Sequence, residues 1–369
     1  MRPASGCKLF GAYQALGGIQ DGIVLLHSVV GCNFGSMSLH VAQDMRDIRQ
    51  TCTVISDSDV VFSGEASLER AVRSALELFQ PSVLFVVSGC VSEMIGDDIP
   101  AVLARIPHEA PLLHVEAAGF RGDAARGLEA GWLALLPLMK PPVPRPYPRP
   151  YPRSDPRPLV NLIGLGMDDP HAADDVEALR AMLAPQAALG AVLSRCTLEE
   201  VRRAPYADVN LVLRGKGREL AQAMKEYFGI PWEELDYPYG AAGADDLWSR
   251  LERRFGLDYH QARAELDRQI AEGAGKAYRY LQALYGMPAA ILASGPRADG
   301  LRRFLEQELG MEVVCFARRE ELSDQEDFYR ELRGSEAALL FGSSFEQCNR
   351  PPTRWSPRAA RSKACFTAA

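Results

Sequence analysis

The segment PSVLFVVSGCVSEMIGDD (residues 81–98) contains one of the most apolar stretches of the sequence. Its residues Val83 to Ser88 form a pattern typical of a buried strand, which ends at Gly89-Cys90. A helical pattern over Ser67 to Phe79 precedes this strand, and we expect another helix over Asp97 to Arg105. Strands and helices that alternate in this way form a parallel sheet with helices on both faces.

The same alternation extends outward in both directions. Before the segment, Gly22 to Val30 is predicted as a strand that ends at Gly31-Cys32, and Asp59 to Phe62 as a short strand. After it, two more runs of strands and helices follow, with a long helical pattern between them. The fold class is therefore predicted as α/β, with three parallel-sheet domains and an inserted helical arm. The predicted division is 1–140, a Pro-rich linker at 141–158, 159–243, the helical arm at 244–288, 289–347, and an irregular tail at 348–369.

The linker and the tail interrupt this pattern. Nine of the eighteen linker residues are proline, so we expect an extended polyproline II connector, with a docking strip for a partner as the alternative. The tail has five basic residues, three prolines and no periodicity. A disordered end is the first interpretation, and a frameshifted or truncated reading is the second.

Composition excludes several classes of protein. The chain has 369 residues and a formal net charge of −7, without the basic stretches of a nucleic-acid-binding protein. Its apolar runs are about half as long as a membrane span needs, and we see no signal peptide. Eight cysteines are too few for a disulfide-framed secreted protein. We therefore expect a cytoplasmic protein in which functional cysteines act as metal ligands or catalytic thiols.

Three cysteines share one sequence context, because Cys7, Cys32 and Cys90 each follow a glycine in the first unit. Two of them lie where a strand ends, at the edge of a parallel sheet where ligands bind. Scattered thiolates without a Cys-x-x-Cys pair favour a multi-iron cluster over a zinc ribbon. Three thiolates do not complete a four-cysteine cluster, so the missing ligands could come from another chain. The competing interpretation is that these are small buried hydrophobic residues.

Three segments resemble the N-terminal domain of the nitrogenase component 1 family. They are GCKLFGAYQALGGIQDGIVLLHSVVGCNFG (6–35), DVVFSGEASLERAV (59–72) and PSVLFVVSGCVSEMIGDDIPAVL (81–103). TLEEVRRAPYADVNLVL (197–213) and GIPW (229–232) resemble its second domain, and LLFGSSFE (339–346) its third. The resemblance covers roughly residues 5–347. By motif, it implies that Cys7, Cys32 and Cys90 hold the electron-relay cluster of the family, either an eight-iron P-cluster or a four-iron cluster shared with a partner subunit.

The resemblance also implies partners and a role. In catalytic α-type subunits, a cysteine after the second-domain NLV strand and a C-terminal histidine bind the active-site cofactor. Here Arg214 follows that strand, and all six histidines precede the third unit. The chain therefore resembles the β-type subunit of a nitrogenase-like reductase. We expect an α-type partner in an α2β2 assembly, and a homodimeric ATP-dependent iron protein that docks near residues 51–60 and delivers electrons.

Several activities stay open for such a complex. The short chain and its departures from dinitrogenase favour a methylthio-alkane reductase, while dinitrogen and a tetrapyrrole remain possible substrates. The alternatives to a reductase subunit are a scaffold on which a cofactor precursor is matured, and a defective chain.

Other polar residues and cysteines are predicted to have structural or surface roles rather than catalytic or ligand roles. Ile163-Gly164-Leu165-Gly166 is predicted as a tight turn rather than a nucleotide loop, and Asp97 and Asp98 as carboxylates at a helix start. We expect His27 to be a hydrogen-bonded structural residue near the cluster, and Asp123 to be a surface charge. The remaining cysteines are expected to be ordinary thiols: Cys52, Cys196, Cys315, Cys348 and Cys365.

Overall fold

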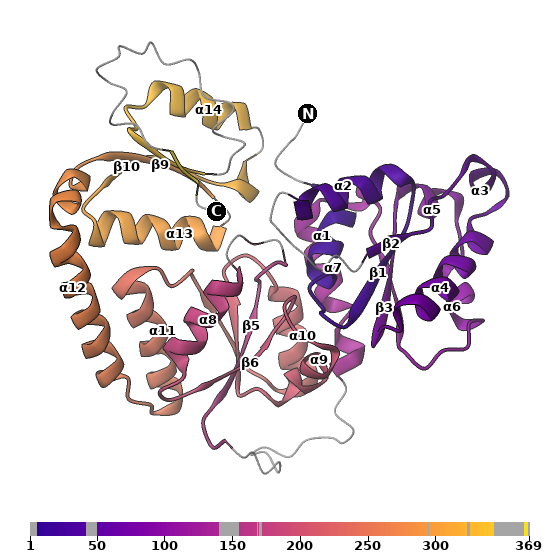
Figure 1. Ribbon diagram of the computed structural model, residues 1–369, viewed down its shortest axis with the longest axis horizontal. Helices are drawn as coiled ribbons and strands as arrows, with labels where there is room; N and C mark the ends of the chain where they lie inside the picture. Colours follow the sequence, from indigo (N-terminus) through magenta and orange to yellow (C-terminus); the bar gives the residue numbers. More distant parts are fainter. Residues whose placement is uncertain are drawn as a thin grey trace.

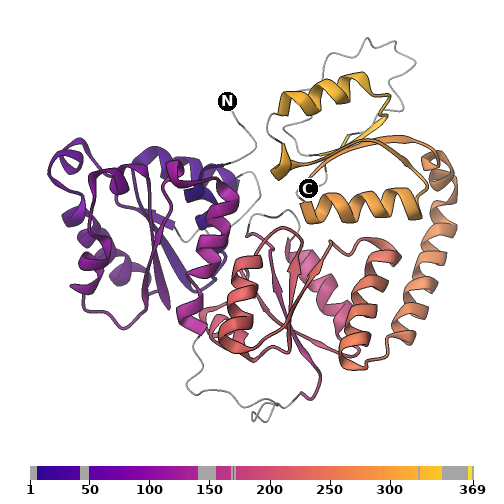
Figure 2. The ribbon, with the colours of Figure 1, turned by 180° about the vertical axis from the view of Figure 1, so that it is seen from behind.

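The computed structural model contains three parallel sheets, each covered by helices (Figure 1). It describes residues 6–41, 50–139, 155–167, 169, 172–293, 295–322, 325–342 and 365–367. The predicted α/β class with three parallel-sheet units is confirmed. The second unit lies between the other two, and the view from behind gives the same arrangement (Figure 2).

The first sheet has the strand order β2-β1-β3-β4. Its strands are β1 (Gly22–His27), β2 (Gln50–Cys52), β3 (Val83–Ser88) and β4 (Leu112–Glu116). Successive residues of β1 point to opposite faces: Leu26 joins the core that contains α1 and α7, whereas Leu25 joins the core that contains α4 and α6. The helices of this unit are α1 (Lys8–Leu16), α2 (Val30–Val41), α3 (Asp57–Phe62), α4 (Glu65–Phe79), α5 (Cys90–Ile95), α6 (Ile99–Ala104) and α7 (Ala124–Leu133).

Two sequence predictions for this unit are wrong. The strand predicted over Asp59 to Phe62 is helix α3, because the Ser56 side chain caps its first turn and the Asp59 side chain accepts from the Ser56 backbone. The strand predicted to reach Val30 ends at His27, and α2 begins at Val30. Cys32 consequently lies in the first turn of a helix rather than in a loop.

The second sheet has the order β6-β5-β7-β8. Its strands are β5 (Leu159–Ile163), β6 (Ala188–Val192), β7 (Val209–Leu213) and β8 (Trp232–Leu235). Its helices are α8 (Ala172–Leu183), α9 (Leu198–Arg203), α10 (Arg218–Phe228) and α11 (Gly240–Phe255). The predicted cap of α9 by Thr197 and Glu200 is confirmed. Residues 141–154 of the predicted linker (141–158) lie outside the described part of the chain.

The third sheet has the order β10-β9-β11-β12. Its strands are β9 (Pro288–Ala293), β10 (Glu312–Arg318), β11 (Leu339–Gly342) and β12 (Cys365–Thr367). Its helices are α13 (Gly295–Arg303), a π-helical turn (Phe304–Glu308) and α14 (Gln325–Gly334). Residues 343–364, which include most of the predicted tail, are outside the described residues, whereas 365–367 pair in parallel with β11.

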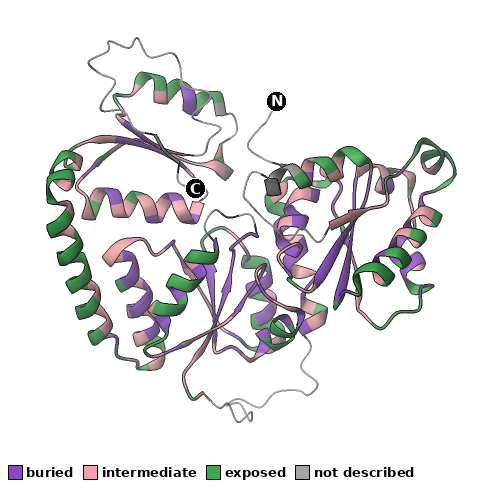
Figure 3. Ribbon diagram, in the orientation of Figure 1, coloured by how far each residue is buried: buried purple, intermediate pink, exposed green. Residues whose placement is uncertain are grey.

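A single long helix, α12 (His260–Leu284), connects the second unit to the third. It has 25 residues, none of which is buried, and it forms the outer edge of the molecule (Figure 3). Its predecessor α11 belongs to the core of the second unit, where Leu247 and Trp248 are buried. Within the described residues, no helix has the length and apolar content to cross a membrane.

The first and second units share one hydrophobic core. Leu16 and Trp132 from the first unit belong to the same buried cluster as Leu193 and Leu220 from the second. Inside it, Trp132 Nε1 donates to Ser194 Oγ at 2.6 Å, and Ser194 Oγ donates to the Ala15 carbonyl at 2.8 Å. Both units therefore bury apolar surface in the same cluster, which packs them against each other.

Candidate metal centre

The three predicted ligands lie beside the carboxyl edge of the first sheet. Cys32 is in the first turn of α2, just beyond β1, and Cys90 is the first residue of α5, just beyond β3. Cys7 immediately precedes α1 and forms an antiparallel bridge with Asp123. All three side chains are partly exposed. A parallel sheet gathers the ends of β1 and β3 at one edge, which explains why residues far apart in the sequence approach this region.

Cys7 and Cys90 meet around Gly119, in the 3₁₀ turn η1 (Gly119–Arg121) after β4. The Gly119 N–H donates to Cys90 Sγ at 3.1 Å. A Cβ at Gly119 would lie 3.4 Å from Cys90 Sγ and 3.8 Å from Cys7 Sγ, with Cys7 Cβ at only 3.0 Å. The absent side chain therefore lets both cysteines lie close to Gly119, whose backbone N–H is a donor that stabilises a thiolate.

Cys32 lies on α2, which contacts α1, the helix that begins just after Cys7. The ring of Phe10, three residues after Cys7, lies against Gly35, where a Cβ would be 2.9 Å from it. Phe10 follows Cys7 by three residues, and Gly35 follows Cys32 by three residues. Cys7 and Cys32 also pack against the same hydrophobic core.

The first sheet also carries Cys52, which the sequence predicts to be an ordinary thiol. Cys52 ends β2, its Sγ donates to the Ser28 carbonyl at 3.4 Å, and it accepts from the Val54 N–H at 3.4 Å. Burial raises the pKa of the Cys52 thiol, these two hydrogen bonds lower it, and the nearby Cys32 raises it further.

The donor set fits an iron–sulfur cluster better than a single ion. Among the described residues, no three His, Cys, Asp or Glu side chains converge on one metal position. In a cluster each thiolate binds its own iron, so the thiols need not converge. Two local features fit a bulky sulfur-rich group. Two cysteines lie close to Gly119, and Ser28 Oγ is buried without a hydrogen-bond partner among the described residues.

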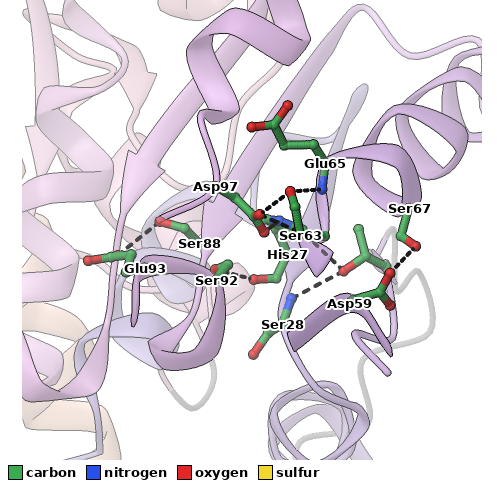
Figure 4. Close-up of polar contacts among 12 residues, drawn as sticks. His27, Ser28, Asp59, Ser63, Glu65, Ser67, Ser88, Ser92, Glu93 and Asp97 are labelled. Carbon is green, nitrogen blue, oxygen red and sulfur yellow. Dashed lines mark hydrogen bonds and ion pairs between the residues drawn. The ribbon is translucent and has the colours of Figure 1, made fainter. Parts of the chain in front are cut away.

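Glu93 fixes the loop that carries Gly119. Its Oε1 accepts from Ser88 Oγ at 2.9 Å (Figure 4). Oε1 also accepts from the Ala118 N–H at 2.8 Å, and Oε2 pairs with Arg121 Nε at 2.7 Å. The carboxylate thus connects the end of β3 to both sides of Gly119. Glu93 lies three residues after Cys90 on α5, so its side chain can reach the loop beside Cys90.

His27 and Asp97 form a buried pair at the same edge (Figure 4). His27 Nε2 lies 2.9 Å from Asp97 Oδ2, and Nδ1 lies 3.1 Å from Thr53 Oγ1. Asp97 Oδ1 accepts from Ser63 Oγ and from the Gly64 N–H, both at 2.9 Å. The predicted hydrogen-bonded role of His27 is confirmed. Burial lowers its pKa, against the raising effect of the hydrogen bond and charge of Asp97.

The two adjacent carboxylates have different roles. Asp98 caps α6 and accepts from the Ala101 N–H at 3.0 Å, as predicted for a helix start. Asp97 does not cap that helix, because its side chain is held by His27 and the turn at Ser63 instead. Asp123 caps α7 and accepts from the Arg126 N–H at 3.1 Å.

The carboxyl edge of the second sheet contains ion pairs. Arg214 Nε lies 2.5 Å from Asp236 Oδ1, so the residue predicted to replace a cofactor cysteine pairs with a carboxylate beyond the neighbouring strand β8. Arg297 of α13 lies 2.7 Å from Asp175 Oδ2 of α8. Gly164, in the predicted tight turn, has φ 104°. Of these pairs, Arg297–Asp175 joins the third unit to the second.

The other cysteines agree with their plain interpretation where the structure describes them. Cys196 and Cys315 are buried thiols, and burial raises the pKa of both, that of Cys315 to about 12. Cys348 is outside the described residues, and only the backbone of Cys365 is described, in β12.

Comparisons with known proteins concern the sequence and the fold of the chain. The sequence model of the family described as nitrogenase component 1 type oxidoreductase matches residues 7–357. The nitrogenase iron-molybdenum cofactor biosynthesis protein NifE of Methanosarcina barkeri is 30% identical over 331 residues, which are 84% of this chain and 68% of that protein. The NifE of Rippkaea orientalis is 27% identical, with 91% of this chain and 71% of that protein covered.

A further relative and a solved structure extend the comparison. The nitrogenase molybdenum-iron protein alpha chain of Methanothermobacter marburgensis is 25% identical, with 89% of this chain and 71% of that protein covered. The solved structure titled "Nitrogenase Cp1 at pH 5" superposes with a TM-score of 0.71 at 22% identity, over 90% of this chain and 71% of that one. This likeness concerns the fold.

Proposed function

Since this chain belongs to the nitrogenase component 1 type oxidoreductase family, we propose that it is a non-catalytic subunit whose Cys7, Cys32 and Cys90 hold an iron–sulfur cluster for electron transfer. The observation that carries the proposal is the meeting of Cys7 and Cys90 around Gly119. A bound cluster, of the eight-iron P-cluster type or with four irons, would accept and pass on single electrons.

The residues of this chain would bind and tune that group. The three thiolates supply ligands, and the Gly119 N–H donates to the Cys90 sulfur at 3.1 Å. Hydrogen bonds to ligand sulfur atoms raise the reduction potential of such clusters, because they stabilise the extra negative charge of the reduced form. Glu93 keeps this donor in place through its bonds to Ser88 and Ala118.

A surface for partners surrounds this edge. Large apolar side chains are exposed on α2, on α3, on α5 and in the loops after β2 and β4, a set that we call the carboxyl-edge patch. It consists of Val30, Phe34, Met37, Val54, Val60, Val61, Phe62, Met94 and Phe120. We propose that an α-type partner subunit, within an α2β2 assembly, and a homodimeric ATP-dependent iron protein cover parts of this patch. Contact with the α-type partner would supply the missing cluster ligands. Contact with the iron protein would bring its electrons close to the cluster.

Two roles are consistent with a non-catalytic subunit. The first is the β-type relay subunit of a cytoplasmic nitrogenase-like reductase. Its support is Arg214, which pairs with Asp236 where catalytic subunits are expected to carry a cofactor cysteine. The substrate would then be chosen by the partner chain, and our proposal is a methylthio-alkane, with dinitrogen or a tetrapyrrole as alternatives.

The second role is a scaffold for cofactor assembly. Its support is that two of the relatives reported above are named for iron-molybdenum cofactor biosynthesis. A scaffold would release a cofactor precursor and turn over little substrate, whereas a relay subunit would support steady reduction.

The experiment that tests the common proposal is anaerobic co-purification with the α-type partner, followed by iron analysis and EPR. Single Cys7→Ala, Cys32→Ala and Cys90→Ala variants should lose most of the iron and the cluster signal. The matched control is Cys315→Ala, which removes a buried thiol from the third unit. Full iron content in all three variants would refute the site. Steady substrate turnover by the complex would indicate the relay role. Transfer of a cofactor precursor to an acceptor protein would indicate the scaffold role.

A further inference from the structure

Residues 54–63 form an exposed segment between β2 and α4, which we call the docking segment. It includes α3 and four of the nine apolar side chains of the carboxyl-edge patch: Val54, Val60, Val61 and Phe62. Phe62 is 84% exposed, and no residue of α3 is buried. A surface of this kind binds a partner tightly only if its position is already defined, because ordering a loose segment on binding reduces the affinity.

Polar contacts rather than hydrophobic packing hold the docking segment. A polar cavity of about 480 Å³ lies between it and α4. The cavity is lined by residues that include Ser56, Ser58, Arg70 and Ser74. Across it, Ser67 Oγ of α4 donates to Asp59 Oδ1 of α3 at 2.8 Å (Figure 4). The position of the segment therefore depends on hydrogen bonds at its middle and at its two ends.

The backbone at each end of the docking segment has a conformation that residues other than glycine rarely adopt. Val54 has φ 55° and Ser63 has φ 108°. Positive φ is a marked exception for a β-branched residue such as Val54. Such conformations persist only where the surrounding structure holds them in place. Both ends of the segment therefore need a fixed support.

The buried pair of His27 and Asp97 supports both ends. At the first end, His27 Nδ1 lies 3.1 Å from Oγ1 of Thr53, the residue that precedes the docking segment. At the second end, Asp97 Oδ1 accepts from Ser63 Oγ at 2.9 Å (Figure 4). The same oxygen accepts from the Gly64 N–H at 2.9 Å. Since His27 Nε2 lies 2.9 Å from Asp97 Oδ2, one bonded unit connects the start of the segment to its end.

We propose that Thr53, Ser63, His27 and Asp97 are positioning residues for electron delivery, because they present the docking segment to the iron protein in one preorganised position. This inference rests on the proposed function and deepens it. His27 is the last residue of β1, the strand that leads to Cys32, so the segment also keeps a fixed relation to the proposed cluster. Loss of one of these bonds should raise the concentration of iron protein that is needed, while the cluster stays bound.

The experiment measures the rate of cluster reduction in the complex with the α-type partner, as the concentration of reduced iron protein is varied in the presence of ATP. Thr53→Val keeps the shape of the side chain and removes its hydroxyl. It should raise the half-saturating concentration about two- to tenfold, with the iron content unchanged and the rate restored by excess iron protein. Thr53→Ser keeps the hydroxyl and should stay near the wild type. Ser63→Ala tests the other end and should act in the same direction as Thr53→Val.

Ser194→Ala is the matched control for lost stability. It removes a buried hydroxyl with two hydrogen bonds from the core that the first and second units share. It should lower the free energy of unfolding and leave the half-saturating concentration unchanged. Hydrogen exchange is a second readout, since the amides of residues 54–63 should exchange faster in Thr53→Val and Ser63→Ala than in the wild type.

An unchanged half-saturating concentration in folded Thr53→Val and Ser63→Ala overturns the inference, and so does an equal rise in Ser194→Ala. If Thr53→Val does not fold, Ser63→Ala decides. The proposed function survives these results as long as Cys7→Ala, Cys32→Ala and Cys90→Ala lose their iron. If those three variants keep their iron, the proposed function itself fails.

Discussion

The imidazole of His27 lies 2.9 Å from the carboxylate of Asp97, and both side chains are buried. The pair joins the end of β1 to the turn at Ser63, between α3 and α4, because Asp97 also accepts from Ser63 and Gly64. It therefore connects the strand that leads to Cys32 with the exposed helix α3. The first prediction concerns how this pair responds to pH.

Acidification should destabilise the fold through His27. Burial lowers its pKa below the ordinary 6.5, so the unfolded chain binds a proton more readily than the folded one. The stabilising contribution is complete above about pH 6.5 and is lost as the pH falls from there toward the folded pKa. Urea unfolding at pH 7 and pH 5.5 measures this difference.

A His27→Gln variant should show a smaller loss between these two pH values. The variant should keep part of the pH-dependent loss of stability, because burial also lowers the pKa of His114. An unchanged loss in the variant would show that His27 does not contribute to the pH dependence.

Gly127→Ala should separate α1 from α7. A Cβ at Gly127 would lie 1.9 Å from the Lys8 carbonyl oxygen, so the helix that begins just after Cys7 would have to move. Overpacking of this kind costs about 1–3 kcal/mol or more. We expect a lower free energy of unfolding and a lower iron content, measured by denaturant titration and iron analysis.

The matched control is Gly275→Ala on α12, where a Cβ meets nothing within 4 Å. It should be neutral or stabilise by up to about 1 kcal/mol, since alanine is the better helix former. Equal destabilisation by both variants would contradict the packing explanation.

Trp132→Phe should weaken the shared core of the first and second units. The substitution removes the donor to Ser194 Oγ in a fully buried position, which costs about 1–3 kcal/mol with the accompanying loss of volume. Trp232→Phe, which loses a 3.3 Å bond to Gln222 at the surface, should cost less than about 1 kcal/mol. Chemical unfolding followed by circular dichroism compares the two, and similar losses would contradict the prediction.

Phe62→Ala should impair electron delivery without a loss of stability. Phe62 is 84% exposed on α3 in the carboxyl-edge patch, and aromatic anchors at interface centres contribute about 2 kcal/mol or more to binding. We expect about a tenfold or greater decrease in the rate of cluster reduction by the iron protein at low concentration. Leu78→Ala, 75% exposed on α4, is the control. A decrease with Leu78→Ala and none with Phe62→Ala would place the docking surface elsewhere.

Local sequence was sufficient for many elements, because their signals are contained in a few neighbouring residues. The apolar run Val83–Ser88 is β3 with the predicted bounds, and the capping pattern at Thr197 marks the start of α9. The same kind of signal was misread at Asp59 to Phe62, where three apolar residues suggested a strand. The capping interactions between Ser56 and Asp59 determine a helix there.

By itself, the sequence determined the α/β class, the three units and the likeness of Cys7, Cys32 and Cys90 to family ligands. Only the tertiary structure decided which side chains meet. It brought Gly119 between Cys7 and Cys90, held Asp97 against His27 rather than at a helix start, and set Cys52 beside Ser28. The physical reason is that strand and helix signals are local, whereas a parallel sheet joins strand ends whose separation in sequence carries no information about their neighbours.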